Sequence, residues 1–235
     1  MLTEFFTNDV IVTNFPFLLQ GIKTTLVLAL WSILFSLLLG TVLGILRYFN
    51  IPIISFISSL FIEFTRAIPL ILYIIFIHYT FSNALYNPDS FIKYLGINSL
   101  EMHTAFISLI LFTSAYIAEI VRSGMGSIDR QQIWDAKSLG LSTFQTLIYI
   151  VLPVVFIRSM PALIAQFASL IKDTSLVSVI GLVELTRCSE ILSQISNKDL
   201  EVMTFVAFIY FIICYTLSFI ANKISNKYSF ITKTA

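Results

Sequence analysis

Residues 127–142 read Ser127-Ile-Asp-Arg-Gln-Gln-Ile-Trp-Asp-Ala-Lys-Ser-Leu-Gly-Leu-Ser142 and form the longest polar interruption in a chain that is 57% hydrophobic. They predict a short amphipathic helix outside the hydrocarbon layer, because their charged side chains could enter lipid only at large cost. Three residues can form its apolar side: Ile128, Trp134 and Leu139. Gly140 predicts a left-handed C-cap, and Ser142 can start the next helix. We therefore expect a helix, a turn and a second helix at one surface of the membrane.

The composition is that of an integral membrane protein. Only 11% of the 235 residues are charged and the mean hydropathy is +0.92, so the chain lacks the polar surface that a soluble domain needs. A net charge of +1 argues against a nucleic-acid partner. No Cys/His cluster has ligand spacing, so neither a metal site nor a disulfide framework is expected. The first nine residues carry no basic stretch and no small-residue cleavage site, so we expect the first membrane helix to be retained.

Five apolar segments are long enough to cross the hydrocarbon layer, which is about 30 Å thick. They cover residues 17–46, 53–79, 102–125, 144–171 and 202–222. Pro69 predicts a kink in the second segment, and Pro153 predicts a bend in the fourth. Gly40 and Gly44 form a small-xxx-small face that lets another helix approach closely, within the subunit or in a dimer. The expected fold is an all-α integral membrane protein, with a single transmembrane domain over residues 1–235.

Basic residues predict the orientation of the spans. One side of the membrane receives seven of them: Arg47, Arg122, Arg130, Lys137, Lys223, Lys227 and Lys233. The other side receives chiefly Lys23, Lys93 and Lys198. Because cytoplasmic loops are enriched in Lys and Arg, we expect the side with seven cations to be cytoplasmic. The amino terminus is then outside, and the carboxyl terminus and residues 127–142 are cytoplasmic.

Polar residues within the spans are candidates for a translocation pathway. Glu63 lies near the middle of the second span, where a bare carboxylate would be costly. Arg66 follows three residues later, on the same helical face. The two side chains either neutralise each other and hold helices together, or line a polar path through the membrane.

A second polar group, Lys172-Asp-Thr-Ser175, follows the fourth span. Asp173, Thr174 or Ser175 can cap a new helix that runs to about Leu192, and the first-turn amides of such a helix favour an anion. The same side chains can also line a substrate cavity, with Asp173 receiving an amino group and the amides a carboxylate. The two roles are not exclusive.

Motifs along the chain resemble those of a known family. The loop of ABC importer permeases carries E-A-A, three residues, Gly, nine residues and I-x-L-P. Five residues stand at these spacings: Ala136, Gly140, Ile150, Leu152 and Pro153. Trp134 and Asp135 replace the Glu and the first Ala. Flanking matches cover 115–122, 170–176 and 181–186. Over residues 17–225 the chain therefore resembles the polar amino acid type of these permeases.

The resemblance implies a permease subunit of an ATP-driven importer in the bacterial cytoplasmic (inner) membrane, carrying a polar amino acid or close analogue. The family shares the E-x-x-R-x-x-P pattern of Glu63, Arg66 and Pro69. The implied substrate pathway is lined by Glu63, Arg66, Asp173, Thr174 and Ser175. The polar loop is then a coupling helix that docks on an ATPase. The residues implied in that coupling are Gln132, Trp134, Asp135, Ala136 and Gly140.

Energy for transport must come from a partner, because no G-x-x-x-x-G-K-[ST] occurs in the chain. The resemblance implies ABC ATPase subunits that bind ATP and Mg, an extracytoplasmic solute-binding protein, and a second permease copy or related chain. Enzyme motifs such as H-E-x-x-H and G-x-S-x-G are missing from the sequence, so we expect no enzyme and no cofactor in this chain. The alternative is an ATP-independent secondary carrier or channel, which should show a repeat of spans and needs no docking helix.

Overall fold

The computed structural model describes residues 9–49, 52–85 and 99–233, which form helices joined by short connections, with no strand in these ranges. The first helices are α2 (Asp9–Thr13), α3 (Phe15–Tyr48), α4 (Pro52–Ala67), α5 (Leu70–Leu85) and α7 (Leu100–Gly126). They are followed by α8 (Arg130–Ser138), α9 (Thr143–Thr146), a π-helix (Leu147–Val151) and α10 (Leu152–Asp173). A 3-10 helix (Thr174–Ile180), α11 (Leu185–Ser196) and α12 (Asp199–Lys233) complete the order. The predicted all-α class is confirmed for these residues.

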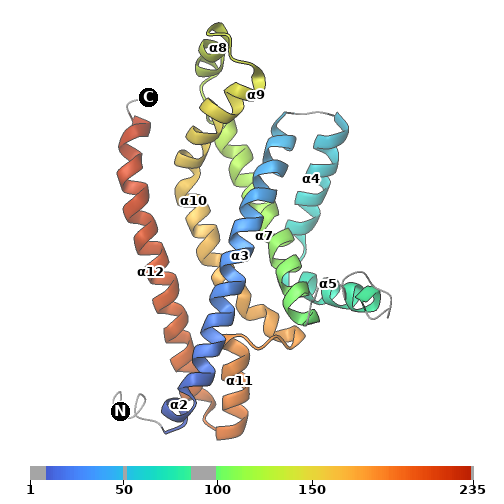
Figure 1. Ribbon diagram of the computed structural model, residues 1–235, viewed down its shortest axis with the longest axis vertical. Coiled ribbons are helices and arrows are strands. Elements are labelled where there is room, and N and C mark those ends of the chain that lie inside the picture. Colours follow the sequence, from blue (N-terminus) through green and yellow to red (C-terminus); the bar gives the residue numbers. More distant parts are fainter. Residues whose placement is uncertain (1–8, 50–51, 86–98, 234–235) are drawn as a thin grey trace.

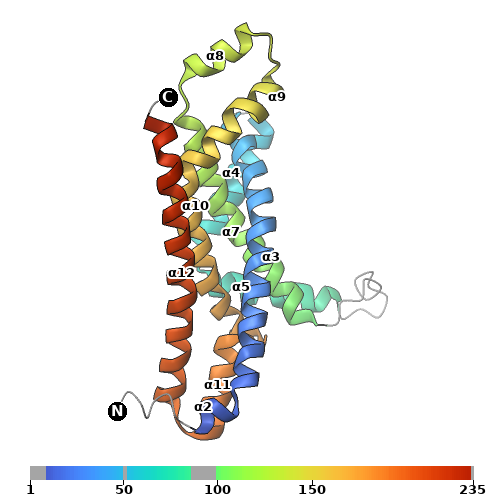
Figure 2. The ribbon, with the colours of Figure 1, turned by 60° about the vertical axis from the view of Figure 1, so that its left-hand side comes forward.

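The long helices α3, α7, α10 and α12 run along the length of the molecule (Figure 1; Figure 2). α8 and α9 extend beyond them at one end, which we call the α8 end. α2 and α11 lie at the opposite end, the α11 end. α3 packs most extensively against α7, whereas α12 contacts α10 and α11. The bundle therefore places the predicted polar loop beyond one end of its long helices.

Four helical stretches of the described chain are long and apolar enough to cross a membrane: Phe15–Tyr48, Leu100–Gly126, Thr143–Ile180 and Asp199–Ile220. The second predicted span is broken into α4 and α5, which meet at an angle of 111° and count as a fifth span only if taken together. The break falls at Pro69, where a bend was predicted, but it is much sharper than a kink. Proline has no N–H to donate and disfavours helical backbone at the preceding residue, so α4 ends before it.

Two glycines let α3 and α7 come into close contact. A Cβ atom at Gly40 would lie 2.7 Å from the Ser114 carbonyl oxygen, and one at Gly44 would lie 2.7 Å from the Ala118 carbonyl oxygen. Contacts this short have no room for a side chain. The small-xxx-small face predicted at these positions therefore packs against a helix of the same chain.

The two sides of α3 reverse the pattern of a soluble helix. Small and hydroxyl side chains such as Thr25, Ser32 and Ser36 are buried. Large apolar side chains such as Leu30 and Leu38 are 58% and 66% exposed. Lipid solvates leucine well, while small residues allow helices to pack closely, so this pattern suits a surface that faces lipid.

Candidate functional site

The polar loop folds as the helix, turn and helix that its sequence predicts. Asp129 caps α8, with its Oδ1 accepting a hydrogen bond of 3.0 Å from the Gln131 amide. After the helix, Gly140 has a φ of +85°, in the left-handed region. The Leu141 amide then donates to the Ala136 carbonyl at 3.2 Å, which closes the turn. Both ends of α8 are thus fixed by local hydrogen bonds.

Ser142 and Gln145 form a capping box at the start of α9. The Ser142 hydroxyl accepts from the Gln145 amide at 3.2 Å, and the Gln145 side chain accepts from the Ser142 amide at 2.8 Å. α9 leads into the π-helix, where the Leu152 amide donates to the Leu147 carbonyl five residues earlier. Pro153, which follows, has no N–H to give an α-helical bond, so this wide turn lies where proline interrupts the regular pattern.

The apolar residues of the loop lie on different sides, which corrects the expectation of one apolar side formed by Ile128, Trp134 and Leu139. Ile128 is buried and packs in the same cluster as Met125, α7 and α10 residues. Trp134 and Leu139 are instead 61% and 84% exposed. The reason is that α8 covers only residues 130–138, so Ile128 precedes the helix and Leu139 follows it.

The other residues predicted for coupling take different positions on α8. Ala136 is buried, while Asp135 is exposed and accepts a 2.8 Å hydrogen bond from the Gln131 side chain. Gln132 is half-buried, and its Oε1 atom is buried without a hydrogen-bond partner among the described residues. Asp135, Trp134 and Leu139 thus form an exposed surface that is partly charged and partly apolar, while Ala136 lies on the buried side of α8.

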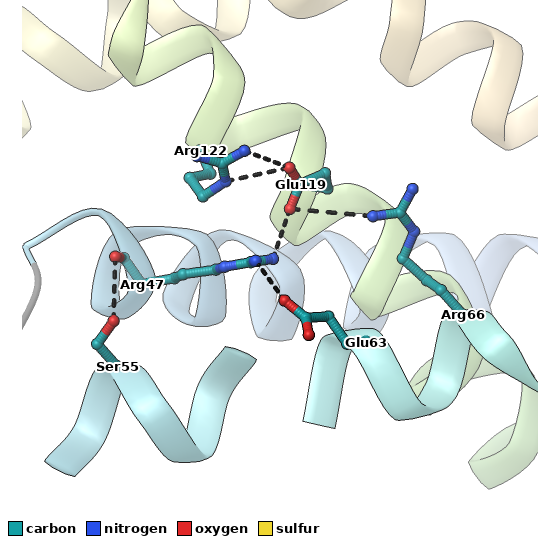
Figure 3. Close-up of polar contacts among 6 residues, drawn as sticks. All are labelled: Arg47, Ser55, Glu63, Arg66, Glu119 and Arg122. Carbon is teal, nitrogen blue, oxygen red and sulfur yellow. Dashed lines mark hydrogen bonds and ion pairs between the residues drawn. The ribbon is translucent and has the colours of Figure 1, made fainter. Parts of the chain in front are cut away.

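A cluster of ion pairs joins α3, α4 and α7 (Figure 3). Glu119 of α7 lies at its centre and accepts a 2.7 Å hydrogen bond from Arg47 Nη1. The Arg122 guanidinium donates to the other Glu119 oxygen, with its Nε at 3.1 Å. Arg47 Nη2 also reaches Glu63 Oε1 at 2.8 Å, and Arg66 Nη1 lies 4.0 Å from Glu119. Three guanidinium groups thus surround two carboxylates, which leaves one positive charge in excess.

Glu63 and Arg66 are therefore not paired with each other, contrary to one of the two predicted roles. Glu63 is 67% exposed and bonds Arg47, while Arg66 lies over the Tyr116 ring at 5.3 Å. Glu63 lies four residues before the end of α4 at Ala67, where it meets Arg47 of the last turn of α3. Sequence reasoning missed Glu119 as the centre of the cluster. The available signal was that Arg47 and Arg122 were predicted on the same side of the membrane, with Glu119 three residues before Arg122.

Asp173, Thr174 and Ser175 do not cap a new α-helix, which corrects the predicted cap. The Thr174 hydroxyl donates back to the Ile171 carbonyl at 2.6 Å, and the Ser175 hydroxyl donates to the Lys172 carbonyl at 2.7 Å. Asp173 makes no capping hydrogen bond, because α10 passes directly into the 3-10 helix. Thr174 is buried, whereas Asp173 and Ser175 are partly exposed. Among the described residues, no hydrogen bond or ion pair connects this group to Glu63 or Arg66.

Glu184 supplies the cap that was predicted ten residues earlier. The chain first turns at Gly181, which has a φ of +86°. The Glu184 carboxylate is fully buried and accepts from the amides of Thr186 at 2.9 Å and Arg187 at 2.8 Å. It also accepts from the Tyr210 hydroxyl at 2.9 Å and lies 3.4 Å from the Thr25 hydroxyl. Burial raises the pKa of this carboxyl, and these four donors oppose the rise.

Comparison with known proteins shows which family the chain resembles. Residues 32–228 match the family described as binding-protein-dependent transport system inner membrane component. The chain is 38% identical over 218 residues to the probable glutamine ABC transporter permease protein GlnP of Bacillus subtilis strain 168, covering 91% of this chain and 94% of that one. It is 32% identical to the glutamine transport system permease protein GlnP of Escherichia coli K12, covering 90% and 93%.

Solved structures with the same fold include the crystal structure of an amino acid ABC transporter with histidines. That chain superposes with a TM-score of 0.77 at 27% identity, over 92% of this chain and 96% of that one. An inward-facing MetNI methionine ABC transporter also superposes with a TM-score of 0.77, over 92% and 98% of the two chains. At 17% identity, this second likeness shows the fold alone.

Proposed function

The chain belongs to the binding-protein-dependent transport system inner membrane component family, as a multi-pass amino acid ABC permease of the inner membrane. We propose that it is the permease subunit of an ATP-driven importer of a polar amino acid. The names of its relatives favour glutamine or a close analogue as the substrate. The chain would form half of the translocation pathway and dock an ATPase through α8.

The protruding α8 is the observation that carries this proposal. It lies beyond the long helices, is capped at both ends, and exposes Trp134 and Leu139 together with Asp135 (Figure 2). Exposed tryptophan is often a major contact in protein interfaces. A rigid helix with such a surface can transmit a push from an ATPase to α7 and α10, into whose cluster Ile128 and Ile133 pack. Gln132, Ala136 and Gly140 would take part in this coupling, Ala136 by packing on the buried side of the helix and Gly140 by forming the turn that ends it.

The orientation of the chain follows from the basic residues. Arg47, Arg122 and Lys137 lie toward the α8 end, where α12 also finishes at Lys233. The positive-inside rule then puts the α8 end in the cytoplasm and the amino terminus outside. An ATPase on the cytoplasmic side would bind ATP and Mg, and a solute-binding protein would deliver substrate at the α11 end.

A second permease chain, identical or related, would complete the pathway. The side chains assigned to that pathway are Glu63, Arg66, Asp173, Thr174 and Ser175. Glu63 and Arg66 suit this role because both are charged and substantially exposed on α4. Switching between inward-facing and outward-facing states would move the two chains as rigid bodies when the ATPases close on ATP.

Glutamine uptake by proteoliposomes tests the proposal, with the chain purified together with its ATPase and supplied with its binding protein. Gly140→Val forces a β-branched residue into the left-handed region and should misplace α8. We expect it to reduce ATP-driven uptake at least tenfold. Gly126→Val is the matched control, because this nearby glycine has an ordinary φ and open space at its Cβ position. Uptake without any ATPase, equal in both variants, would instead establish the secondary carrier.

A further inference from the structure

A cleft lined by both polar and apolar residues lies between α7 and α10, in the half of the bundle nearest the α8 end. Its volume is about 400 Å³, which is within the usual range for a small-molecule site. The lining contains two charged residues, Glu119 and Arg158, and three hydroxyl residues, Ser123, Ser127 and Ser159. Gly124 lets α7 and α10 pack closely at the edge of the cleft, because a Cβ atom there would lie 2.5 Å from Ser159 Oγ.

Arg158 enters this cleft without a carboxylate partner. Its Nη1 donates a 2.7 Å hydrogen bond to the Ser127 carbonyl, which uses one of its five N–H groups. Among the described residues, no carboxylate lies within 4.0 Å of its guanidinium, whereas Arg47 and Arg122 both bind Glu119. An arginine within a membrane-spanning helix is costly unless it has a partner or a function. The remaining N–H groups are therefore available to a ligand.

Glu119 does not neutralise Arg158, although both line the cleft. Its two oxygens already accept from Arg47 and Arg122, and Arg66 lies 4.0 Å away. With Arg158 included, four guanidinium groups share this region with two carboxylates, Glu63 and Glu119, leaving two positive charges in excess. The Ser159 hydroxyl has no hydrogen-bond partner among the described residues and adds a further donor. The cleft thus favours an anion with planar oxygen acceptors.

We propose that this cleft binds the α-carboxylate of the transported amino acid, with Arg158 as its main receptor and Ser159 beside it. The inference rests on the proposed function and adds a binding station that the pathway residues Glu63, Arg66 and Asp173 do not supply. An arginine can hold a carboxylate through two parallel N–H···O bonds, which gives both affinity and orientation. The substrate would meet this station on the α8 side of the bundle, before release.

The test compares two ligands that differ only in the carboxylate: L-glutamine and L-glutamine α-amide. Binding of each is measured to the permease–ATPase complex in lipid nanodiscs, without the binding protein. We expect the native complex to prefer glutamine about tenfold, as for a charge-assisted hydrogen bond. Arg158→Gln should reduce that preference to less than about twofold, and Arg158→Lys should restore part of it. Lys23→Gln is the control, because it removes one exposed cation from a different helix, α3.

The ligand pair separates recognition from a structural role. If Arg158 only holds the Ser127 carbonyl, Arg158→Gln will weaken both ligands by the same factor and leave the preference unchanged, which overturns the proposal. A native complex that binds neither ligand also overturns it. Glutamine uptake by the native transporter is measured in parallel. If the native transporter takes up no glutamine, the proposed function is wrong. If it does, but Arg158→Gln keeps the native ligand preference, only the proposed role of the cleft is wrong.

Discussion

Two polar networks hold the helices together at opposite ends of the bundle, and they are built from different interactions. Toward the α8 end, Arg47, Glu63 and Glu119 form ion pairs whose side chains are 18–67% exposed. At the α11 end, the single carboxylate of Glu184 is fully buried and receives hydrogen bonds from α11, α12 and α3. Exposed ion pairs can exchange partners at little cost, whereas a buried carboxylate cannot lose its donors without a large penalty.

This difference indicates which end can rearrange during transport. The ion pairs connect α4 and α7 with the end of α3, close to the helix proposed to receive the ATPase. The Glu184 network fixes the start of α11 to α3 and α12, and the carboxylate at its centre is fully buried. We expect the first network to change its pairing between states and the second to move as a rigid unit.

The largest effect is expected from Glu184→Leu. The amides of Thr186 and Arg187 would be left without an acceptor, each at a cost of about 1–3 kcal/mol, and the Tyr210 hydroxyl would keep only its 3.1 Å contact with the Thr186 hydroxyl. We expect the free energy of unfolding to fall by about 3 kcal/mol or more, as measured by thermal unfolding in detergent. Glu190→Leu is the control, because its carboxylate is partly exposed and pairs with Arg187. If the free energy of unfolding falls equally in the two variants, the buried Glu184 carboxylate stabilises the fold no more than the partly exposed Glu190 carboxylate does.

Tyr210→Phe should have an intermediate effect. It removes the 2.9 Å hydrogen bond to Glu184 and the 3.1 Å contact with the Thr186 hydroxyl, but keeps the aromatic ring. We expect a loss of about 1–2 kcal/mol in the same unfolding measurement. Tyr215→Phe removes a hydroxyl from the same helix at a position that is 61% exposed. If the two variants are equally stable, Tyr210 does not hold α12 to α11.

The smallest effect on stability is expected at the ion pairs. A double-mutant cycle with Arg47→Met and Glu119→Gln should give a coupling free energy of about 1 kcal/mol or less, because both groups are partly solvated. ATP-driven uptake should fall several-fold in each single variant. A coupling energy as large as the loss from Glu184→Leu would contradict the distinction between the two networks.

Features whose partners lie within a few residues could be predicted from the sequence. Gly140 occupies the predicted left-handed turn, and Ser142 caps the helix after it. The break at Pro69 also follows from local chemistry. In each case the backbone requirement is met by the residue itself, so no knowledge of the tertiary fold was needed.

Features that depend on distant partners could not be predicted. Arg47 meets Glu119 across 72 positions of sequence, and Glu184 meets Thr25 across 159. The cap predicted at Asp173–Ser175 was wrong because Thr174 and Ser175 can equally donate to carbonyls of the preceding turn, and a continuing helix makes that choice. Residue type limited the candidates, but packing selected among them.

Site-specific cross-linking can show whether α8 contacts the ATPase. A photoreactive phenylalanine analogue at position 134 replaces the exposed Trp134, and the same probe at position 195 replaces Ile195, which is 75% exposed at the α11 end. In transport-competent membranes, we expect a cross-link from position 134 to the nucleotide-binding subunit, and none from position 195. Undiminished uptake with no cross-link from position 134, or with equal cross-links from both positions, would contradict it.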